Sequence, residues 1–379
     1  MTTLSIPRPI AGAAPVGGAQ PFSRAFGLRN ILAALCGLTF VVPAMAGGPL
    51  EEHAYKVLPP IVRGNLAIFP VLGANAHDAS GLLTLDEGVR TGQVTVTEAG
   101  SMRGLVRNGH PIPQPSGGAE VNRLVLYNNS DKPLLLLAGE IVTGGKQDRI
   151  VGADRIVAAN SGPIDLGVFC VEPGRWVESS KNFGSMGAQM AQPSVRTPAM
   201  AAKNQSEVWA NVATSNKRMA ETVTVETGAD AVSGMSSYAK VFASPQVAKV
   251  MTEYGGAESE QAILRELRSK GAVGVVVAVN GQVQWADVFA STELLAKYWP
   301  KLMRSYVAEA MTDGKSGGTA ELKDAERFIE ALGGSREVVE TEDGVFRRSD
   351  ITGDGYRVFE LTALLPKTGF VVHLTKMMQ

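Results

Sequence analysis

Short apolar segments joined by short polar turns fill the middle of this 379-residue chain and restrict the folds that it can adopt. A parallel crossover needs about a dozen residues or more, which these turns do not provide, so we expect mainly antiparallel pairing. Asn280-Gly281 separates two apolar runs within 274–289 and predicts a tight hairpin. A second hairpin is expected around the polar turn 128–131. The other predicted strands are 66–71, 93–97, 124–127, 132–137, 150–157, 164–171, 338–339, 344–348, 356–361 and 369–374.

Helices are predicted in groups and do not alternate with single strands. Segment 184–203 is rich in Met, Ala, Gln and Pro without a regular period, so we expect a flexible loop there. Strands and helices in blocks indicate an α+β fold with mostly antiparallel sheets, in one large or two intimately packed domains. We expect a main domain over 47–313, followed over 314–379 by a helix and a small antiparallel sheet. The helices predicted from apolar periodicity and capping residues are 84–91, 205–223, 258–270, 291–311 and 322–332.

The first 46 residues have the order typical of an export signal. Three arginines and no acid flank an apolar run over 31–42, and Ala44-Met45-Ala46 provides a small-x-small exit. The apolar run is shorter than the roughly 20 residues that a membrane-spanning helix needs. We therefore predict a signal peptide over 1–46, cleavage after Ala46, and a periplasmic or secreted mature chain.

The composition argues against several classes of function. Loss of residues 1–46 changes the net charge from −1 to −4, and no basic block remains that would bind nucleic acid. No apolar run after Ala46 approaches membrane length, so we expect no membrane association after signal cleavage. The four histidines are scattered and form no i, i+4 pair, so the sequence predicts no metal site. We also expect no cofactor.

Cys170 is the only cysteine left once Cys36 departs with the signal, so an intramolecular disulfide is impossible. A nearby cation such as Lys146 or Arg175 would lower the pKa of the thiol and activate it as a nucleophile. Alternatively, Cys170 is a small apolar residue buried in a strand. Its apolar neighbours favour burial, and we expect the thiol to be dispensable.

Two dense polar signatures lie within forty residues of each other, at 139–149 (GEIVTGGKQDR) and 170–176 (CVEPGRW). Each follows an apolar strand and presents an acid, a base and an amide or thiol at the strand end. Loops at strand ends commonly carry function while the strands hold them in place. We therefore expect the two turns to meet in space, with Glu140 or Glu172 paired to the cations of the turns.

The two signatures together resemble a bacterial family of unknown function, the ARG and rhodanese-phosphatase-superfamily-associated protein domain. The resemblance covers about 54–311 and implies an association, through gene neighbours, with ADP-ribose and phosphate-ester metabolism, without a demonstrated activity. Ile141 stands where the family pattern has a second acid, so a role that needs paired carboxylates at this turn is not supported. The matching residues are Gly139-Glu140, Gly145-Lys146-Gln147-x-Arg149 and Cys170-Val171-Glu172-x-Gly174-Arg175-Trp176, with further support from 83–87, 95–98, Asn280-Gly281, 287–289 and Ser305-Tyr306.

The cations of these turns allow three interpretations. Arginine suits bidentate contacts to phosphate or carboxylate, so our leading hypothesis is a pocket that binds an anionic small molecule or peptide. An ADP-ribose- or phosphate-ester-related enzyme, with Glu140 and Glu172 as candidate catalytic residues, is the first alternative. A structural or assembly module with internal ion pairs is the second. The residues expected to line the site are Glu140, Lys146, Gln147, Arg149, Glu172, Arg175 and Trp176.

Overall fold

The computed structural model describes residues 55–379 apart from 75, 100–105, 108–109, 112–119, 229, 256, 314–316 and 366–368. The predicted signal peptide over 1–46 lies outside the described residues. Glu51–Gln379 form one compact unit. None of the described helices is both long and apolar enough to cross a membrane.

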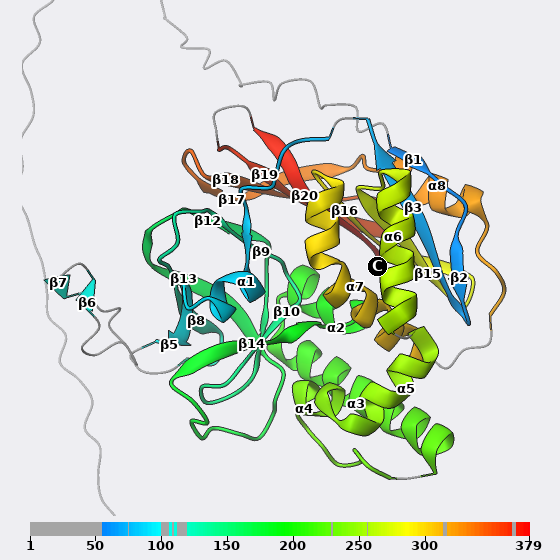
Figure 1. The fold of residues 1–379 in the computed structure, drawn as a ribbon, viewed down its shortest axis with the longest axis horizontal. Coiled ribbons are helices and arrows are strands. Elements are labelled where there is room, and N and C mark those ends of the chain that lie inside the picture. Colours follow the sequence, from blue (N-terminus) through cyan, green and yellow to red (C-terminus); the bar gives the residue numbers. More distant parts are fainter. Residues whose placement is uncertain are drawn as a thin grey trace, which may run out of the picture. The chain divides into compact units, whose positions relative to one another are not determined.

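A nine-stranded sheet contains both the first and the last strands of the described chain (Figure 1). The predicted hairpin is confirmed: β15 and β16 pair around Asn280 and Gly281, whose φ angles of 52° and 77° are those of the tight turn expected there. The antiparallel strands predicted over 314–379 are present, but they belong to this larger sheet, which they join through pairing of β20 with β16. The strand order is β1 (Tyr55–Val57), β3 (Leu66–Gly73), β15 (Gly274–Val279), β16 (Gln282–Phe289), β20 (Phe370–Met378), β19 (Tyr356–Ala363), β18 (Phe346–Thr352) and β17 (Ser335–Glu342), and β2 (Ile61–Arg63) also pairs with β3.

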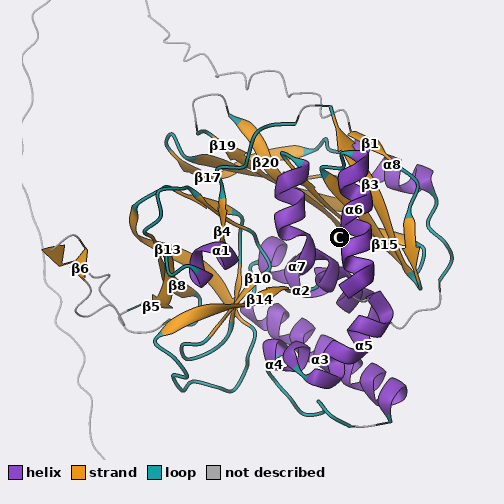
Figure 2. Ribbon diagram, in the orientation of Figure 1, coloured by secondary structure: helices purple, strands orange, loops and turns teal. Residues whose placement is uncertain are grey.

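Alternate side chains of this sheet pack against different helices. Val275 and Val277 belong to the core that includes α7 (Thr292–Thr312), whereas Val276 packs with residues of α8 (Leu322–Glu330). This period-two alternation is what a strand covered on both faces requires. In Figure 2, α7 crosses in front of the strands that it contacts, β15 and β16.

A closed six-stranded barrel holds the two polar turns. Its interior is apolar, with Val96, Leu126 and Val168 among its fully enclosed residues. Each strand contributes alternate residues to that interior, as barrel closure demands. In order around the barrel the strands are β10 (Glu140–Thr143), β11 (Arg149–Val151), β13 (Ser161–Cys170), β8 (Arg123–Asn128), β5 (Val94–Glu98) and β14 (Asn182–Met190).

A small third sheet corrects two predictions. β9 (Leu134–Leu136) pairs with β12 (Arg155–Val157) and, in parallel, with β4 (Leu83–Thr84). The hairpin expected around 128–131 is therefore wrong, although the turn forms: Asn128 Nδ2 donates to the Lys132 carbonyl at 2.8 Å, and the chain then enters another sheet. The strand expected over 150–157 is broken between β11 and β12, where the Asp154 carboxylate accepts from the Ala138 amide at 2.7 Å.

The segment expected as a flexible loop near 184–203 forms regular structure instead. It contains β14, α2 (Pro193–Thr197) and the π-helix η1 (Pro198–Ala202). Ala191 and Ala199 are fully buried, so the small side chains reflect close packing. The remaining elements are α1 (Leu85–Arg90), which the Thr84 capping box begins, α3 (Gln205–Thr227), α4 (Tyr238–Ala243), α5 (Pro245–Gly255), α6 (Ala257–Lys270), β6 (Val106–Arg107) and β7 (His110–Pro111).

Candidate functional site

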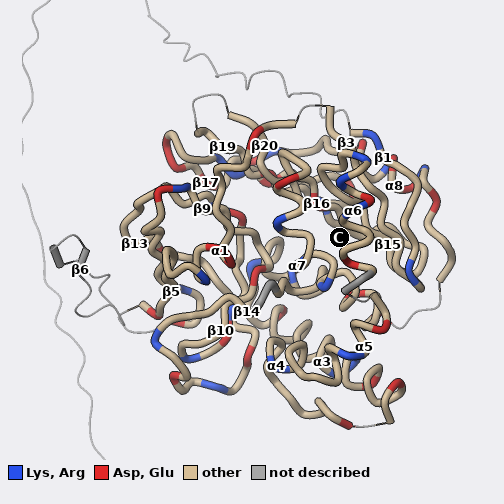
Figure 3. The backbone as a smooth tube through the Cα atoms, in the orientation of Figure 1, with Lys and Arg blue, Asp and Glu red and all other residues tan. Residues whose placement is uncertain are grey.

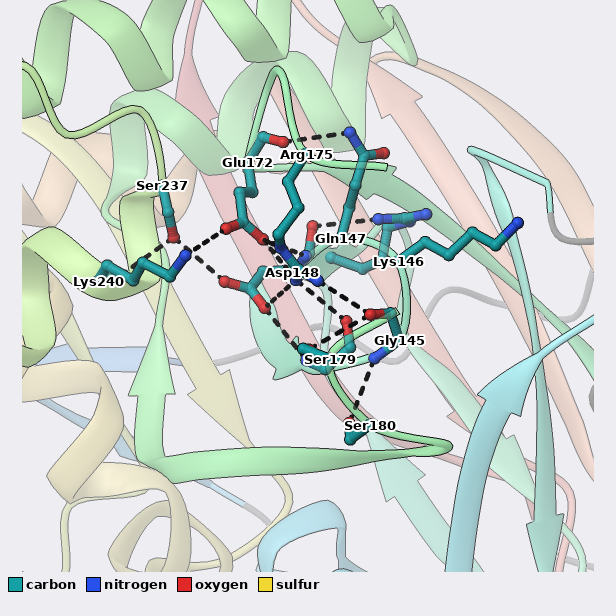
Figure 4. A network of polar contacts seen from close by, with 12 residues as sticks. Gly145, Lys146, Gln147, Asp148, Glu172, Arg175, Ser179, Ser180, Ser237 and Lys240 are labelled. Atoms are coloured by element: carbon teal, nitrogen blue, oxygen red, sulfur yellow. Dashed lines mark hydrogen bonds and ion pairs between the residues drawn. The ribbon is translucent and has the colours of Figure 1, made fainter. Parts of the chain in front are cut away.

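The two polar turns meet at one end of the barrel, as predicted (Figure 4). β11 pairs with β13 so that Arg149 lies opposite Cys170, which brings the segments beyond both strands together. The Asp148 amide donates to Glu172 Oε2 at 3.2 Å, and Gln147 Nε2 donates to the Glu172 carbonyl at 3.1 Å. The pairing of β11 with β13 therefore creates a single polar junction, which we call the turn junction.

Arg175 holds the turn junction together. Its Nε donates to Glu172 Oε2 at 2.7 Å and its Nη1 to the Gly145 carbonyl at 2.9 Å, while Nη2 lies 3.4 Å from Asp148 Oδ1. Gly145 adopts a φ of 49°, and a Cβ there would lie 2.3 Å from Phe183 Cζ. A glycine is thus required for the turn to present its carbonyl to the guanidinium.

The two carboxylates of the turn junction have opposite pKa shifts. Burial and the neighbouring Glu172 raise the pKa of Asp148. Burial also acts to raise the pKa of Glu172, but hydrogen bonds from Arg175 and Lys240 lower it below its usual range. Lys240 Nζ lies 2.8 Å from Glu172 Oε1, and Ser237 Oγ donates to Asp148 Oδ2 at 3.1 Å.

Lys240 and Ser237 were not identified from the sequence. Ser237 caps α4, because its hydroxyl accepts a hydrogen bond from the Lys240 amide at 3.1 Å. The same hydroxyl contacts Asp148 in the turn junction. A serine before a short apolar helix was the local signal that could have marked it. Its proximity to Asp148 depends on the tertiary fold.

The outer side of the turn junction is formed by a tryptophan and two cations. Lys146 Nζ lies 5.1 Å from the ring centroid of Trp176, and Arg149 Cζ lies 5.9 Å from it. The Trp176 residue is 43% exposed, whereas Arg149 is fully buried. Arg149 Nε donates to the Val121 carbonyl at 2.8 Å, and among the described residues Nη2 has only a long contact of 3.9 Å to Glu98. Lys146 therefore retains donor capacity beside a partly exposed aromatic ring, whereas Arg149 lies buried behind that ring with an unsatisfied Nη2.

Glu140 does not belong to the turn junction, which corrects the predicted grouping. It begins β10, whereas the turn follows the other end of that strand, about 10 Å away at the usual rise per residue. Its Oε1 lies 2.5 Å from Lys301 Nζ on α7, and its Oε2 accepts from the Leu137 amide at 2.7 Å. Asp86 contacts the same ammonium group.

Burial dominates the electrostatics around Glu140. It raises the pKa of the Glu140 carboxyl, although the Lys301 ammonium acts in the opposite direction. Burial alone would lower the pKa of Lys301, but the carboxylates of Glu140 and Asp86 raise it overall. This group joins the start of β10 to α7 and forms an internal salt bridge.

The Cys170 thiol is buried beneath the turn junction. The Glu172 amide donates to Cys170 Sγ at 3.4 Å. Burial raises the pKa of Cys170, an effect stronger than the stabilisation of the thiolate by Arg149. The thiol is therefore held in its weakly nucleophilic form, as the prediction of a buried cysteine requires.

The family model that matches the chain is the ARG and Rhodanese-Phosphatase-superfamily-associated Protein domain, over residues 54–377. The chain belongs to this family. No curated protein and no solved structure matches it. The matched region runs through the boundary predicted at 313, in agreement with the continuity of the nine-stranded sheet.

Other residues in the family resemblance converge on a buried cluster around Asp287. Asp287 Oδ2 accepts from Arg196 Nη1 at 3.0 Å, from Trp285 Nε1 at 2.8 Å and from the Tyr306 hydroxyl at 2.5 Å. Oδ1 accepts from Arg196 Nη2 at 3.2 Å and from Thr375 Oγ1 at 2.9 Å. We call these residues, with His373 and Asp154, the Asp287 cluster. It connects β16, β20, α2, α7 and the barrel edge.

His373 completes the charge balance of the Asp287 cluster. Its Nδ1 lies 2.6 Å from Asp154 Oδ2, and its Nε2 lies 3.3 Å from Asp287 Oδ1. Burial acts to lower the pKa of His373, but the two carboxylates raise it to about 9. The ring is therefore protonated at neutral pH, so it does not act as a general base there.

Gly139 of the first signature supports the Asp287 cluster sterically. With a φ of 98°, it lies so close to Arg196 that a Cβ would be 2.7 Å from Arg196 Cγ and Nε. Gly139 and Glu140 thus each support a buried salt bridge, Arg196–Asp287 and Lys301–Glu140 respectively. Within the described part of the chain, no group of three or more His, Cys, Asp or Glu residues could hold a metal ion.

Proposed function

We propose that the protein binds an anionic small molecule at the outer side of the turn junction, against Lys146 and Trp176, with the buried Arg149 behind them. An excess of positive charge supports this best. Four cations, Lys146, Arg149, Arg175 and Lys240, face three carboxylates, Glu98, Asp148 and Glu172. Acidic and basic residues are otherwise interspersed along the described chain (Figure 3).

The ligand class follows from the groups that remain available. Trp176 is partly exposed, so its indole offers an aromatic surface for a planar ring. Lys146 supplies a charged donor beside it, and the buried Arg149 adds positive charge behind the ring. Charge-assisted hydrogen bonds to phosphate or carboxylate are about twice as strong as neutral ones. We therefore propose a small anion that carries a ring, of the nucleotide or phosphosugar type.

The same geometry argues for binding without catalysis. Glu172 accepts hydrogen bonds from three groups and its pKa is lowered, so it is a poor general acid. Glu140, the other candidate, is paired with Lys301 at the opposite end of β10 from the turn junction. The ion pair between Glu172 and Arg175 supports a structural role for the inner part of the turn junction. This inner part holds the residues of the proposed binding site in place.

Isothermal titration of the chain from residue 47 onward, with ADP-ribose, ADP and glucose 6-phosphate, tests the proposal. We expect binding of at least one of these anions, and a loss of at least tenfold in affinity for Trp176→Ala and for Lys146→Gln. Lys217→Gln removes one exposed cation from α3 and serves as the matched control. Turnover of a bound anion would favour the enzyme, and no binding would favour the structural module.

We also propose that the mature chain is exported and begins near Gly47. The order of arginines, apolar run and Ala44-Met45-Ala46 supports cleavage after Ala46. Amino-terminal sequencing of the protein from its native host should give Gly47. A cytosolic product that retains Met1 would contradict export.

A further inference from the structure

A cavity of about 310 Å³ lies among the helices, and none of its described lining residues belongs to the turn junction. Residues of β14, α4, α5, α6 and α7 line it, and much of the wall is apolar, with Phe242, Met251, Met303 and Val307 among the lining residues. An apolar cavity of about 150 Å³ is already large enough to bind benzene. This cavity, which we call the helical cavity, therefore has room for a ring that carries a substituent.

The uncharged polar side chains of the wall bond to the protein itself. Tyr238 is only 1% exposed, and its hydroxyl accepts from the Gln192 amide at 3.0 Å. Gln189 Nε2 donates to the Phe242 carbonyl at 3.4 Å, and its Oε1 is fully buried. The charged residues of the wall are therefore the ones that decide which ligands the helical cavity accepts.

The charged residues of the wall oppose each other. Glu260 on α6 and Arg304 on α7 both line the helical cavity, and the shortest distance between them, from Arg304 Nε to Glu260 Oε2, is 3.8 Å. The formal charges of the described lining residues thus add up to zero. A charged ligand would be attracted by one of the two groups and repelled by the other, and it would lose hydration that an apolar wall does not replace.

We propose that the helical cavity binds an uncharged apolar molecule of about the size of a substituted single ring. The ligand packs against Phe242, Met251 and Met303, and the flexible methionine side chains adapt to its shape. Ala248 and Thr252, one turn apart on α5, are exposed residues of the lining, so their small side chains leave the entrance open. The ligand differs in chemistry from the one proposed for the turn junction.

Three probes built on the same ring test the charge preference: toluene, benzoate and benzylammonium. Isothermal titration uses the chain from residue 47 onward with Trp176→Ala, because benzoate is itself a ring-bearing anion that the turn junction could bind. We expect toluene to bind at least about tenfold more tightly than either ion, since only the ions lose a hydration shell. Equal or tighter binding of either ion, or no toluene binding at millimolar concentration, would overturn the proposal. Toluene should bind the protein with Trp176 intact equally well, which separates this test from that of the anion site.

A bulky substitution at the entrance tests the location. Ala248→Trp should weaken toluene binding at least tenfold, because the indole occupies the opening of the helical cavity. The matched control is Gln246→Trp, at an exposed position of the same helix outside the lining, which should leave toluene binding unchanged. Toluene binding that survives Ala248→Trp, with the far-ultraviolet circular dichroism unchanged, would refute the site.

The opposing charges are tested one at a time. Arg304→Gln leaves Glu260 without this opposing cation and should strengthen benzylammonium by about threefold, in line with the modest energy of a partly exposed ion pair. Glu260→Gln should strengthen benzoate by a similar factor, and neither variant should alter toluene binding. An unchanged affinity for both ions in the two variants would contradict a cavity whose ligand charge is set by this pair.

Discussion

The Asp287 cluster and the turn junction use the same chemistry to different ends. Both join distant segments through an arginine paired with carboxylates. In the Asp287 cluster, two cations and two carboxylates balance, and Arg196, Asp287 and His373 are fully buried. In the turn junction the cations are in excess, and the Arg175 side chain is 19% exposed. Balanced, enclosed charge stabilises a fold, whereas an unbalanced edge beside an exposed aromatic residue is able to take a ligand.

The largest expected effect is on the Asp287 cluster. Asp287→Asn leaves Arg196 and His373 without a full counter-charge in an enclosed site, where loss of one partner typically costs about 3–5 kcal/mol. We expect the free energy of unfolding, measured with urea, to fall by that amount. The matched control is Asp343→Asn at an exposed position, which should change it by less than about 0.5 kcal/mol. A loss below about 1 kcal/mol for Asp287→Asn would remove the contrast between the two regions.

The pH dependence of stability tests the same cluster. The folded pKa of His373 is raised from 6.5 to about 9, so its contribution is complete below pH 6.5 and disappears as pH rises through 9. The full effect is on the order of 3 kcal/mol. Lys376, whose pKa burial lowers to about 8, acts in the opposite direction. The difference between the free energies of unfolding of the wild type and of His373→Gln, measured against pH, should therefore isolate the alkaline loss that is due to His373. The same pH dependence in both proteins would contradict a charged His373.

An intermediate effect is expected at Arg175. Arg175→Ala removes the donors to Glu172 and Gly145, but Lys240 and the Asp148 amide continue to bond Glu172. We expect a loss of about 1–3 kcal/mol in the free energy of unfolding by urea denaturation. A loss as large as that of Asp287→Asn would mean that the turn junction is as enclosed as the Asp287 cluster.

The smallest stability effect is expected at Trp176. Because the residue is 43% exposed, Trp176→Ala should change the free energy of unfolding by less than about 0.5–1 kcal/mol while it weakens anion binding at least tenfold. Thermal unfolding with and without ligand measures both quantities on one sample. A marked loss of stability would mean that Trp176 supports the fold of the turn junction and does not serve mainly to bind the ligand.

The sequence was sufficient where the structural signal is local. Asn280-Gly281 requires its own turn conformation, and Thr84 with Glu87 forms the capping box that begins α1. Asn128 gave an equally local signal, and its turn is present. The hairpin predicted around this turn is absent because β9 pairs with β4 and β12 and not with β8.

The candidate site was predicted in part for the same reason. The two signatures each follow a strand, and adjacent pairing of β11 with β13 brings their ends together. The partner of Glu140 is Lys301, on a helix far along the chain, and nothing near either residue indicates the other. Arg196 lies in a segment whose small residues resembled a loop, so its pairing with Asp287 was missed. Buried salt bridges depend on the tertiary fold, and the apolar periodicity of a sequence does not indicate which charged residues will meet.

The order of strands in the nine-stranded sheet has a consequence for how the chain folds. All six barrel strands lie between Val94 and Met190, so the barrel can close from one continuous segment. In the sheet, β3 pairs with β15, and β16 pairs with β20, which ends at Met378. These pairs join segments that are far apart in the chain. Pairing between such distant segments is slow because loop closure costs entropy before any contact forms. We therefore expect completion of the sheet, beyond its local hairpins, to be slower than closure of the barrel. A chain that stops short of β20 lacks His373 and Thr375 and leaves Asp287 without two of its partners.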